Sequence, residues 1–158
     1  MSDRLFNTAD QNVKVVLVPC YLDGNDGIVN LKYYDWLTAS DLCLYPSYYE
    51  PWGYTCLESI AFGIPCLTTD IAGFGVWANS VVGHNSMLKD GVQVIHRSDS
   101  NYEEAAGQIA DTVETFSALK ESEIKAIRTN ASQLAKKAQW KDFIQHYYQA
   151  FDQAFKNK

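Results

Sequence analysis

Two carboxylates flank a short loop in the first half of the chain. Glu50 and Glu58 are separated by seven residues, and residues 46–58 read Pro-Ser-Tyr-Tyr-Glu-Pro-Trp-Gly-Tyr-Thr-Cys-Leu-Glu. A carboxylate can accept hydrogen bonds from sugar hydroxyls, and the free N–H groups at the start of a helix can hold phosphates. The segment would therefore suit a ligand in which a sugar is joined to a phosphate, provided that the loop leads directly into a helix.

The residues around this loop predict the strand and the helix that would position it. Residues 42–45 are a short apolar run, which is typical of a buried strand. Pro51 and Gly53 favour a loop. The Thr-Cys-Leu-Glu sequence of residues 55–58 has the spacing of a capping box and predicts a helix over residues 56–62. Glu50 is thus expected on the connection between a strand and a helix.

Strands and helices are predicted to alternate along the chain. Further strands are expected over residues 13–18, 65–69 and 92–95, a helix over 31–39, and a loop at 73–75. Strands separated by helices predict an α/β fold with a parallel sheet. In such sheets ligands bind beyond the carboxyl ends of the strands. The loops that follow Tyr45 and Thr69 both lie at that edge.

The second half of the chain predicts three helices. Ser100 and Glu103 have capping-box spacing, and the first helix is expected to bury Tyr102, Ala106, Ile109, Val113 and Phe116. The second is expected to bury Ile124, Ile127, Ala131, Leu134 and Ala138. The last helix is strongly amphipathic, with an aromatic-rich stripe made of Trp140, Phe143, Ile144, Tyr147, Tyr148, Phe151 and Phe155.

The string around Glu50 resembles a known family motif. It is similar to the Glu-(seven residues)-Glu motif of retaining glycosyltransferases with the GT-B fold. Its residue sequence resembles that of glycogen synthases of the UDP-glucose-dependent, eukaryotic type. The resemblance continues through residues 63–65 and 67–75, and more weakly through Gln-Trp-Lys at 139–141 and the Tyr-Tyr pair at 147–148. It implies a Rossmann-like half-domain, a parallel sheet flanked by helices, with further helices at the C-terminus.

The resemblance also implies a reaction. The full enzyme would transfer glucose from UDP-glucose to the non-reducing end of an α-1,4-glucan such as glycogen. Glu50 would be the catalytic residue, which contacts the donor glucose and stabilises the positive charge that develops on the sugar. Glu58 would bind the ribose hydroxyls of the nucleotide. As the fourth residue of a capping box, Glu58 can instead reach back to the N–H of Thr55, which is a structural role.

The turn between these carboxylates has both a functional and a structural interpretation. By resemblance, Gly53, Tyr54 and Thr55 would meet the diphosphate of the donor, although the same residues would make an ordinary helix start. Gly53 would let the backbone approach the ligand closely. By resemblance, Trp52 would line the sugar pocket. The alternative role of Trp52 is packing in the core.

Three further residues complete the expected binding set. By resemblance, Tyr33 would stack on the uracil, but a shift of one residue would give that role to Tyr34, and a core-facing tyrosine is the alternative. Thr69 and Gly73 would border the cleft near the acceptor. Their structural alternative is a tight turn in the loop after the third strand.

The length of the chain indicates one domain. Its 158 residues are enough for one hydrophobic core, whereas a GT-B enzyme needs two Rossmann-like domains. Residues 1–158 are therefore expected to be a single, partial C-terminal nucleotide-sugar-binding domain, without the N-terminal domain and without the basic segment that grips the diphosphate. Such a piece is expected to be inactive alone, and an exposed apolar face would favour a homo-oligomer.

Charge and cysteine content narrow the classes of partner. The net charge of −6 argues against binding to nucleic acid or to anionic membranes. Neither a membrane span nor a signal peptide is apparent. The four cysteines form no Cys-x-x-Cys pair, which indicates free thiols in a reducing cytoplasm and no zinc site. No motif requires a metal or another cofactor.

Two other functions fit the same sequence. One is a retaining GT-B transferase with a different sugar or acceptor, and the other is a non-catalytic module that binds a glucan or a protein. Regulation by glucose 6-phosphate is not expected. The family's arginine-rich helix corresponds to residues 123–136, where the basic residues are Lys125, Arg128 and Lys136, and strong phosphate binding needs clustered arginines.

Overall fold

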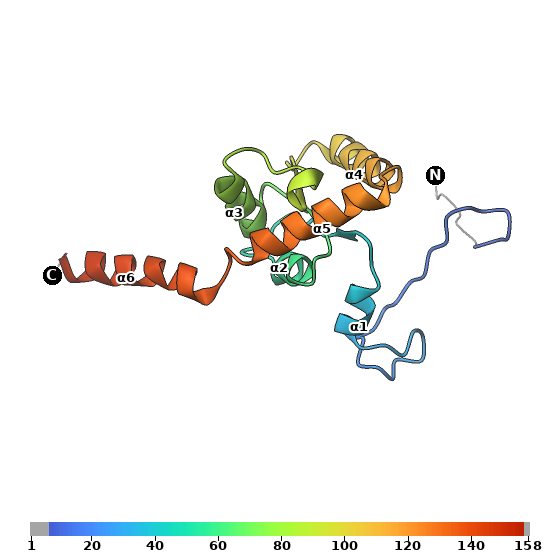
Figure 1. Ribbon diagram of the computed structural model, residues 1–158, viewed down its shortest axis with the longest axis horizontal. Coiled ribbons are helices and arrows are strands. Elements are labelled where there is room, and N and C mark those ends of the chain that lie inside the picture. The colour runs from blue at the N-terminus through green and yellow to red at the C-terminus, as the bar shows by residue number, and fades with distance from the viewer. Residues whose placement is uncertain (1–6, 157–158) are drawn as a thin grey trace. The chain divides into compact units, whose positions relative to one another are not determined.

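A computed structural model of the chain describes residues 7–156 (Figure 1). The strands are β1 Cys43–Leu44, β2 Cys66–Thr69 and β3 Val92–Ile95. The helices are α1 Tyr33–Thr38, α2 Tyr54–Ala61, α3 Gly73–Val82, α4 Tyr102–Ser117, α5 Glu121–Ala135 and α6 Trp140–Lys156, with a 3-10 turn η1 at Leu88–Asp90. The chain divides into two compact units, Met1–Ala39 and Ser40–Lys158.

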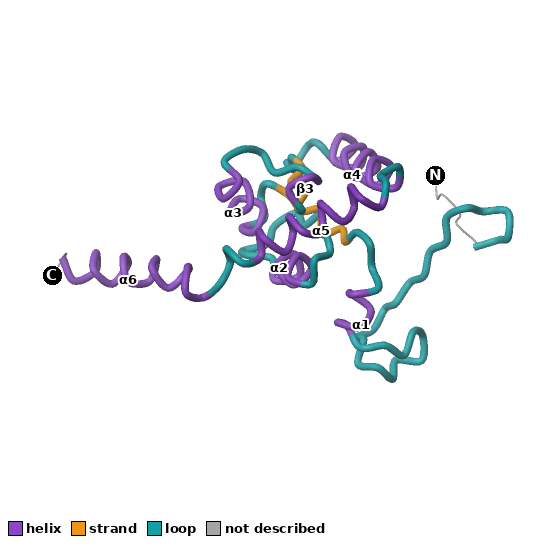
Figure 2. The backbone as a smooth tube through the Cα atoms, viewed as in Figure 1, coloured by secondary structure: helices purple, strands orange, loops and turns teal. Residues whose placement is uncertain are grey.

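The second unit is built on a parallel sheet. Its strand order is β1-β2-β3, both neighbouring pairs are parallel, and helices connect consecutive strands. Figure 2 shows these short strands among the surrounding helices. Every residue of the central strand β2 is buried, as expected where helices cover both faces of a sheet. The predicted α/β fold with a parallel sheet is confirmed.

Alternate residues of the strands pack against opposite layers, because successive side chains in a strand point to opposite faces. On one face Cys66, Val92 and Val94 pack with buried residues of α2, α3 and α5, namely Cys56, Ile60, Phe74, Ala78, Ala131 and Leu134. On the other face Leu67 and Ile95 pack with Ala105 of α4. The sheet is therefore the middle of three layers.

The strand predicted over residues 13–18 is not found. Val13, Val16 and Leu17 are between 62% and 79% exposed, and the main chain of Val15 bonds to the side chain of Asn7. A strand needs a neighbouring backbone to pair with, and residues 13–18 have none within the part of the chain that the structure describes. Because β1 lies at one edge of the sheet, its Leu44 is 39% exposed, where a buried strand was predicted.

The helices match the predictions to different degrees. In α5, Ile127, Ala131 and Leu134 are buried as expected. In α4 the predicted stripe is confirmed only in part. Phe116 is buried and Ile109 packs against the cluster of Leu67 and Ile95, but Tyr102, Ala106 and Val113 are exposed. Helix α4 instead also buries Ala105 and Thr112. The N-cap of α4 is Asn101 and not Ser100, and none of the residues of α6 is buried.

Candidate functional site

The two loops at the carboxyl edge of the sheet are joined through their backbones. Glu50, in the β1–α2 loop, forms a parallel bridge with Ala72, in the β2–α3 loop. The N–H of Gly73 donates to the carbonyl of Glu50 over 2.9 Å, and the N–H of Phe74 donates to the carbonyl of Trp52 over 2.6 Å. These bonds hold the half-buried Glu50 between two helix starts.

Helix α2 begins directly after this loop, with an open first turn. Its N-cap is Gly53, whose φ of 113° is in the left-handed region that favours glycine, and no side chain among residues 7–156 caps the turn. The predicted capping box is wrong, because Thr55 lies inside the helix. The first N–H groups of a helix have no partner within it, so those of α2 can bind an anion.

Helix α3 begins at Gly73, where a loop was predicted. A side chain at Gly73 would place its Cβ 2.1 Å from the carbonyl oxygen of Pro51, so the close contact between the two loops requires a glycine. Phe74 and Ala78 lie one turn apart in this helix and are fully buried. Their burial outweighs the turn preference of the Gly-Phe-Gly sequence. Since the first two N–H groups of α3 bond to the Glu50 loop, this helix start serves the structure.

Trp52 lies in a cluster of aromatic rings. Its ring centroid is 5.7 Å from that of Phe74 and 5.3 Å from that of Phe143, both nearly edge to face. The ring also borders a cavity of about 440 Å³ together with Tyr54 and Trp140. The packing role of Trp52 is therefore present, and its contact with a sugar stays a prediction.

Thr69 and Glu58 have different environments. Thr69 is fully buried at the end of β2, and its hydroxyl donates to the carbonyl of Ser47 over 2.8 Å. This bond ties the β2–α3 loop to the Glu50 loop. Glu58 is half-buried in the second turn of α2. The roles of both residues toward a substrate stay predictions.

Tyr33 is the first residue of α1, in the unit Met1–Ala39. It is half-buried, its N–H donates to the carbonyl of Leu22 over 3.1 Å, and its ring lies 5.2 Å from the ring of Tyr34. Tyr34 is 49% exposed. The stacking role on a base stays a prediction for either tyrosine.

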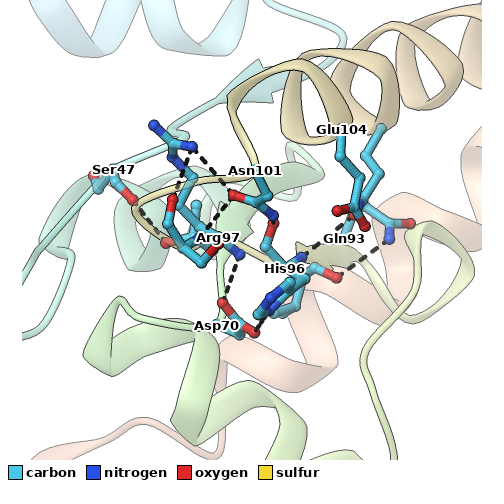
Figure 3. Close-up of polar contacts among 11 residues, drawn as sticks. Ser47, Asp70, Gln93, His96, Arg97, Asn101 and Glu104 are labelled. Carbon is cyan, nitrogen blue, oxygen red and sulfur yellow. Dashed lines mark hydrogen bonds and ion pairs between the residues drawn. The ribbon is translucent and has the colours of Figure 1, made fainter.

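A polar cluster that we did not predict lies at the same edge of the sheet (Figure 3). One carboxylate oxygen of Asp70, after β2, lies 2.6 Å from Nδ1 of His96, and the other accepts the N–H of Arg97 over 2.9 Å. The hydrogen bond and the charge of Asp70 raise the pKa of His96 above its ordinary value. Asn101 accepts from the Arg97 guanidinium and donates to the carbonyl of His96.

The sequence did contain a signal for this cluster. His96 and Arg97 directly follow the strand Val92–Ile95, so they occupy the carboxyl end of a parallel strand, as Glu50 and Asp70 do. The three histidines of the chain form no metal-binding pattern, and by that pattern alone His96 is a structural or surface residue. The place of His96 and Arg97 at the end of a strand is thus the same local signal that marks Glu50.

The described residues contain neither a candidate metal site nor a candidate membrane-spanning helix. Residues 7–156 contain no group of three or more histidines, cysteines, aspartates or glutamates that could hold a metal ion. Among the helices in the same residues, none combines the length and the apolar character needed to cross a membrane.

Comparison with known proteins identifies the family. Residues 2–158 match the model of the glycogen synthase family. The chain is 35% identical to glycogen [starch] synthase isoform 1 of Saccharomyces cerevisiae over 72% of its length, and 30% identical to the liver glycogen [starch] synthase of Homo sapiens over 92% of its length. It spans only 16% and 20% of these two relatives. The match along almost the whole chain shows that this protein belongs to the glycogen synthase family.

Proposed function

We propose that this chain is the nucleotide-sugar-binding part of a retaining, GT-B-type glucosyltransferase. The complete enzyme would transfer glucose from UDP-glucose to the non-reducing end of an α-1,4-glucan such as glycogen. The N-terminal domain of the same enzyme would supply the other half of the cleft. The observation that carries the proposal is that Glu50 is held beside the open first turn of α2.

The proposed roles follow from this arrangement. The first N–H groups of α2, near Tyr54 and Thr55, would bind the diphosphate, since the positive end of a helix favours anions. Tyr54 is 71% exposed and Thr55 is exposed, so a ligand can reach this turn. Gly53 has no side chain that would block the approach. Glu58 would bind the ribose, and Tyr33 or Tyr34 would stack on the uracil.

In the proposed reaction, the bond between the sugar C1 and the phosphate oxygen breaks, and its electron pair leaves with UDP. The 4-oxygen of the acceptor forms the new bond to C1, and its proton passes to the departing phosphate. Positive charge develops on the sugar during this exchange. The carboxylate of Glu50 would stabilise that charge, which is an effect that acts mainly in the transition state.

We also propose that the reaction takes place in the cytoplasm. The four cysteines are free, and Cys56 and Cys66 are buried, which suits a reducing cytoplasm.

Helix α6 exposes Trp140, Tyr147, Tyr148, Phe151 and Phe155. We propose that another part of the enzyme, or a second copy, covers this aromatic face, because large exposed apolar patches mark interaction sites.

The experiment that tests the function is glucosyl transfer from radiolabelled UDP-glucose to glycogen by the complete enzyme. Glu50→Gln should lower kcat by about 100-fold or more, because it removes the negative charge while keeping the size of the side chain. UDP should inhibit the variant as well as it inhibits the wild type, since the helix start is unchanged. Glu114→Gln, an exposed change of the same kind in α4, should retain full activity.

Other outcomes would change the proposal in defined ways. A wild type that binds UDP without transferring glucose would indicate a different sugar or acceptor, and analysis of products from other nucleotide sugars would identify it. A complete enzyme that fails to bind UDP would favour a non-catalytic glucan- or protein-binding module. Full activity in Glu50→Gln would refute the catalytic role of Glu50.

A further inference from the structure

The loop that carries Glu50 is held by its main chain from one side. The carbonyl of Ser47 accepts the Thr69 hydroxyl over 2.8 Å, and the carbonyl of Glu50 accepts the N–H of Gly73 over 2.9 Å. Both donors belong to the connection between β2 and α3. These bonds fix the course of the backbone, but they do not hold the side chains between Ser47 and Glu50.

Arg97 reaches the same loop from the connection between β3 and α4. The carbon at the centre of its guanidinium lies 5.1 Å from the centre of the Tyr48 ring, two residues before Glu50. It also lies 5.8 Å from the centre of the Tyr102 ring. A guanidinium within about 6 Å of an aromatic ring is attracted to the ring face. Arg97 therefore contacts the Glu50 loop through a side chain.

Both the backbone and the guanidinium of Arg97 are held by hydrogen bonds (Figure 3). Its N–H donates to Asp70 over 2.9 Å, and its Nη1 donates to the carbonyl of Ser98 and to Oδ1 of Asn101, each over 3.2 Å. Arg97 is half-buried, and in the described part of the chain no carboxylate lies within ion-pair distance of its guanidinium. Its charge is thus free to act on the aromatic rings.

We propose that Arg97 is a positioning residue, which holds the Tyr48 side of the loop so that the Glu50 carboxylate keeps its working orientation. This inference rests on the proposed function of Glu50. Arg97 acts through Tyr48 and need not touch the substrate. A small displacement of a catalytic group lowers the rate of the chemical step more than it lowers binding. The contact should therefore affect kcat more than the KM for UDP-glucose.

A double-mutant cycle between Arg97 and Tyr48 in the complete enzyme tests this role. Arg97→Met and Tyr48→Leu should each lower kcat about 10-fold, with little change in KM or in inhibition by UDP. The double variant should lose no more than either single variant, because both changes break the same contact. Tyr48→Phe keeps the ring and should stay close to the wild type. Arg97→Lys keeps the charge and should recover part of kcat.

Amide hydrogen exchange of the same variants tests the position of the loop without an activity assay. Arg97→Met should accelerate exchange at residues 48–50 and leave the buried stripe of α5 unchanged. Arg128→Met also removes one arginine charge, but Arg128 pairs with Asp41, and this change should affect neither kcat nor the loop.

Each contrary result has a distinct meaning. Losses of kcat that multiply in the double variant, or unchanged exchange at residues 48–50, would overturn the role of Arg97. A melting temperature that falls in step with kcat would make Arg97 a purely structural residue. No transfer by the wild type would count against the proposed function, and the exchange experiment would still decide the role of Arg97.

Discussion

At the scale of single residues, two glycines decide how the candidate site is built. Gly73 lets the β2–α3 connection approach Pro51 so closely that any side chain would collide with its carbonyl oxygen. Gly53 adopts the left-handed conformation that turns the chain into α2. Together they place Glu50 at the junction of two helix starts, one of which is used by backbone bonds while the other is open.

His96 should make the stability of the protein depend on pH. Its pKa is raised mainly by the hydrogen bond to Asp70, and the charges of Asp70 and Glu104 act in the same direction. Protonated His96 therefore favours the folded state. The stabilisation should be fully present below the ordinary histidine pKa of about 6.5 and should be lost as the pH rises through the higher value of the folded protein.

Urea denaturation of the wild type and of His96→Gln at about pH 5.5 and pH 8.5 would measure this effect on either side of the histidine range. The wild type should be the more stable protein at the lower pH, and the difference should shrink at the higher pH. His146→Gln is the control for the loss of a histidine, since His146 forms no ion pair within the described residues. A pH-independent difference for His96→Gln would contradict the Asp70 pair.

At the scale of the elements, the sheet decides which face each helix buries. Helix α5 packs beside α2 and η1 and buries the stripe that its sequence predicts (Figure 1). Helix α4 covers the opposite face of the sheet, where Leu67 and Ile95 meet Ala105. Its apolar residues occupy a broad arc of the helix surface, so their spacing predicted a face that is rotated from the one that packs, although Ile109 and Phe116 belong to both.

Two substitutions in α4 separate the predicted face from the observed one. Phe116 is 8% exposed and packs with Leu88 and Ile127, whereas Val113, one turn earlier, is 43% exposed. Phe116→Ala should lower the free energy of unfolding by about 3 kcal/mol, because it leaves a cavity in this cluster. Val113→Ala should change it by less than about 0.5 kcal/mol. Equal losses in urea denaturation would show that both residues face the core.

At the scale of the whole molecule, the four thiols report on burial in both units. Cys20, in the first unit, is exposed, and Cys43 is half-buried at the edge of the sheet. Cys56 and Cys66 are buried in the main cluster of the second unit. The hydrogen bond to Cys56, together with complete burial, raises the pKa of the Cys66 thiol. Cys66 is therefore expected to be inert while the protein is folded.

Labelling with a maleimide, followed by peptide mass spectrometry, should give a clear order of reactivity. Cys20 should react first. Cys66 should react at least about 100-fold more slowly than Cys20, because its thiol becomes accessible only when the core opens. Urea should make all four cysteines react at similar rates. Fast labelling of Cys66 in the folded protein would contradict the packing of β2.

The α/β class, the parallel sheet, the family and the loop that carries Glu50 could all be predicted from the order of the amino acids. Each of these depends on local signals, such as the apolar runs of residues 65–69 and 92–95 and the string around Glu50. Composition and spacing reflect a few neighbouring residues, so these features can be predicted without knowledge of the fold.

Other features depend on contacts between residues that are far apart in the chain, so they follow only from the folded protein. The apolar residues at 13–18 form no strand, because no other described segment pairs with their backbone. Gly73 begins a helix because Phe74 and Ala78 are buried against the sheet. Arg97 meets Tyr48 only because β1, β2 and β3 end at one edge. No local pattern around Arg97 specifies that contact, so only the folded chain reveals it.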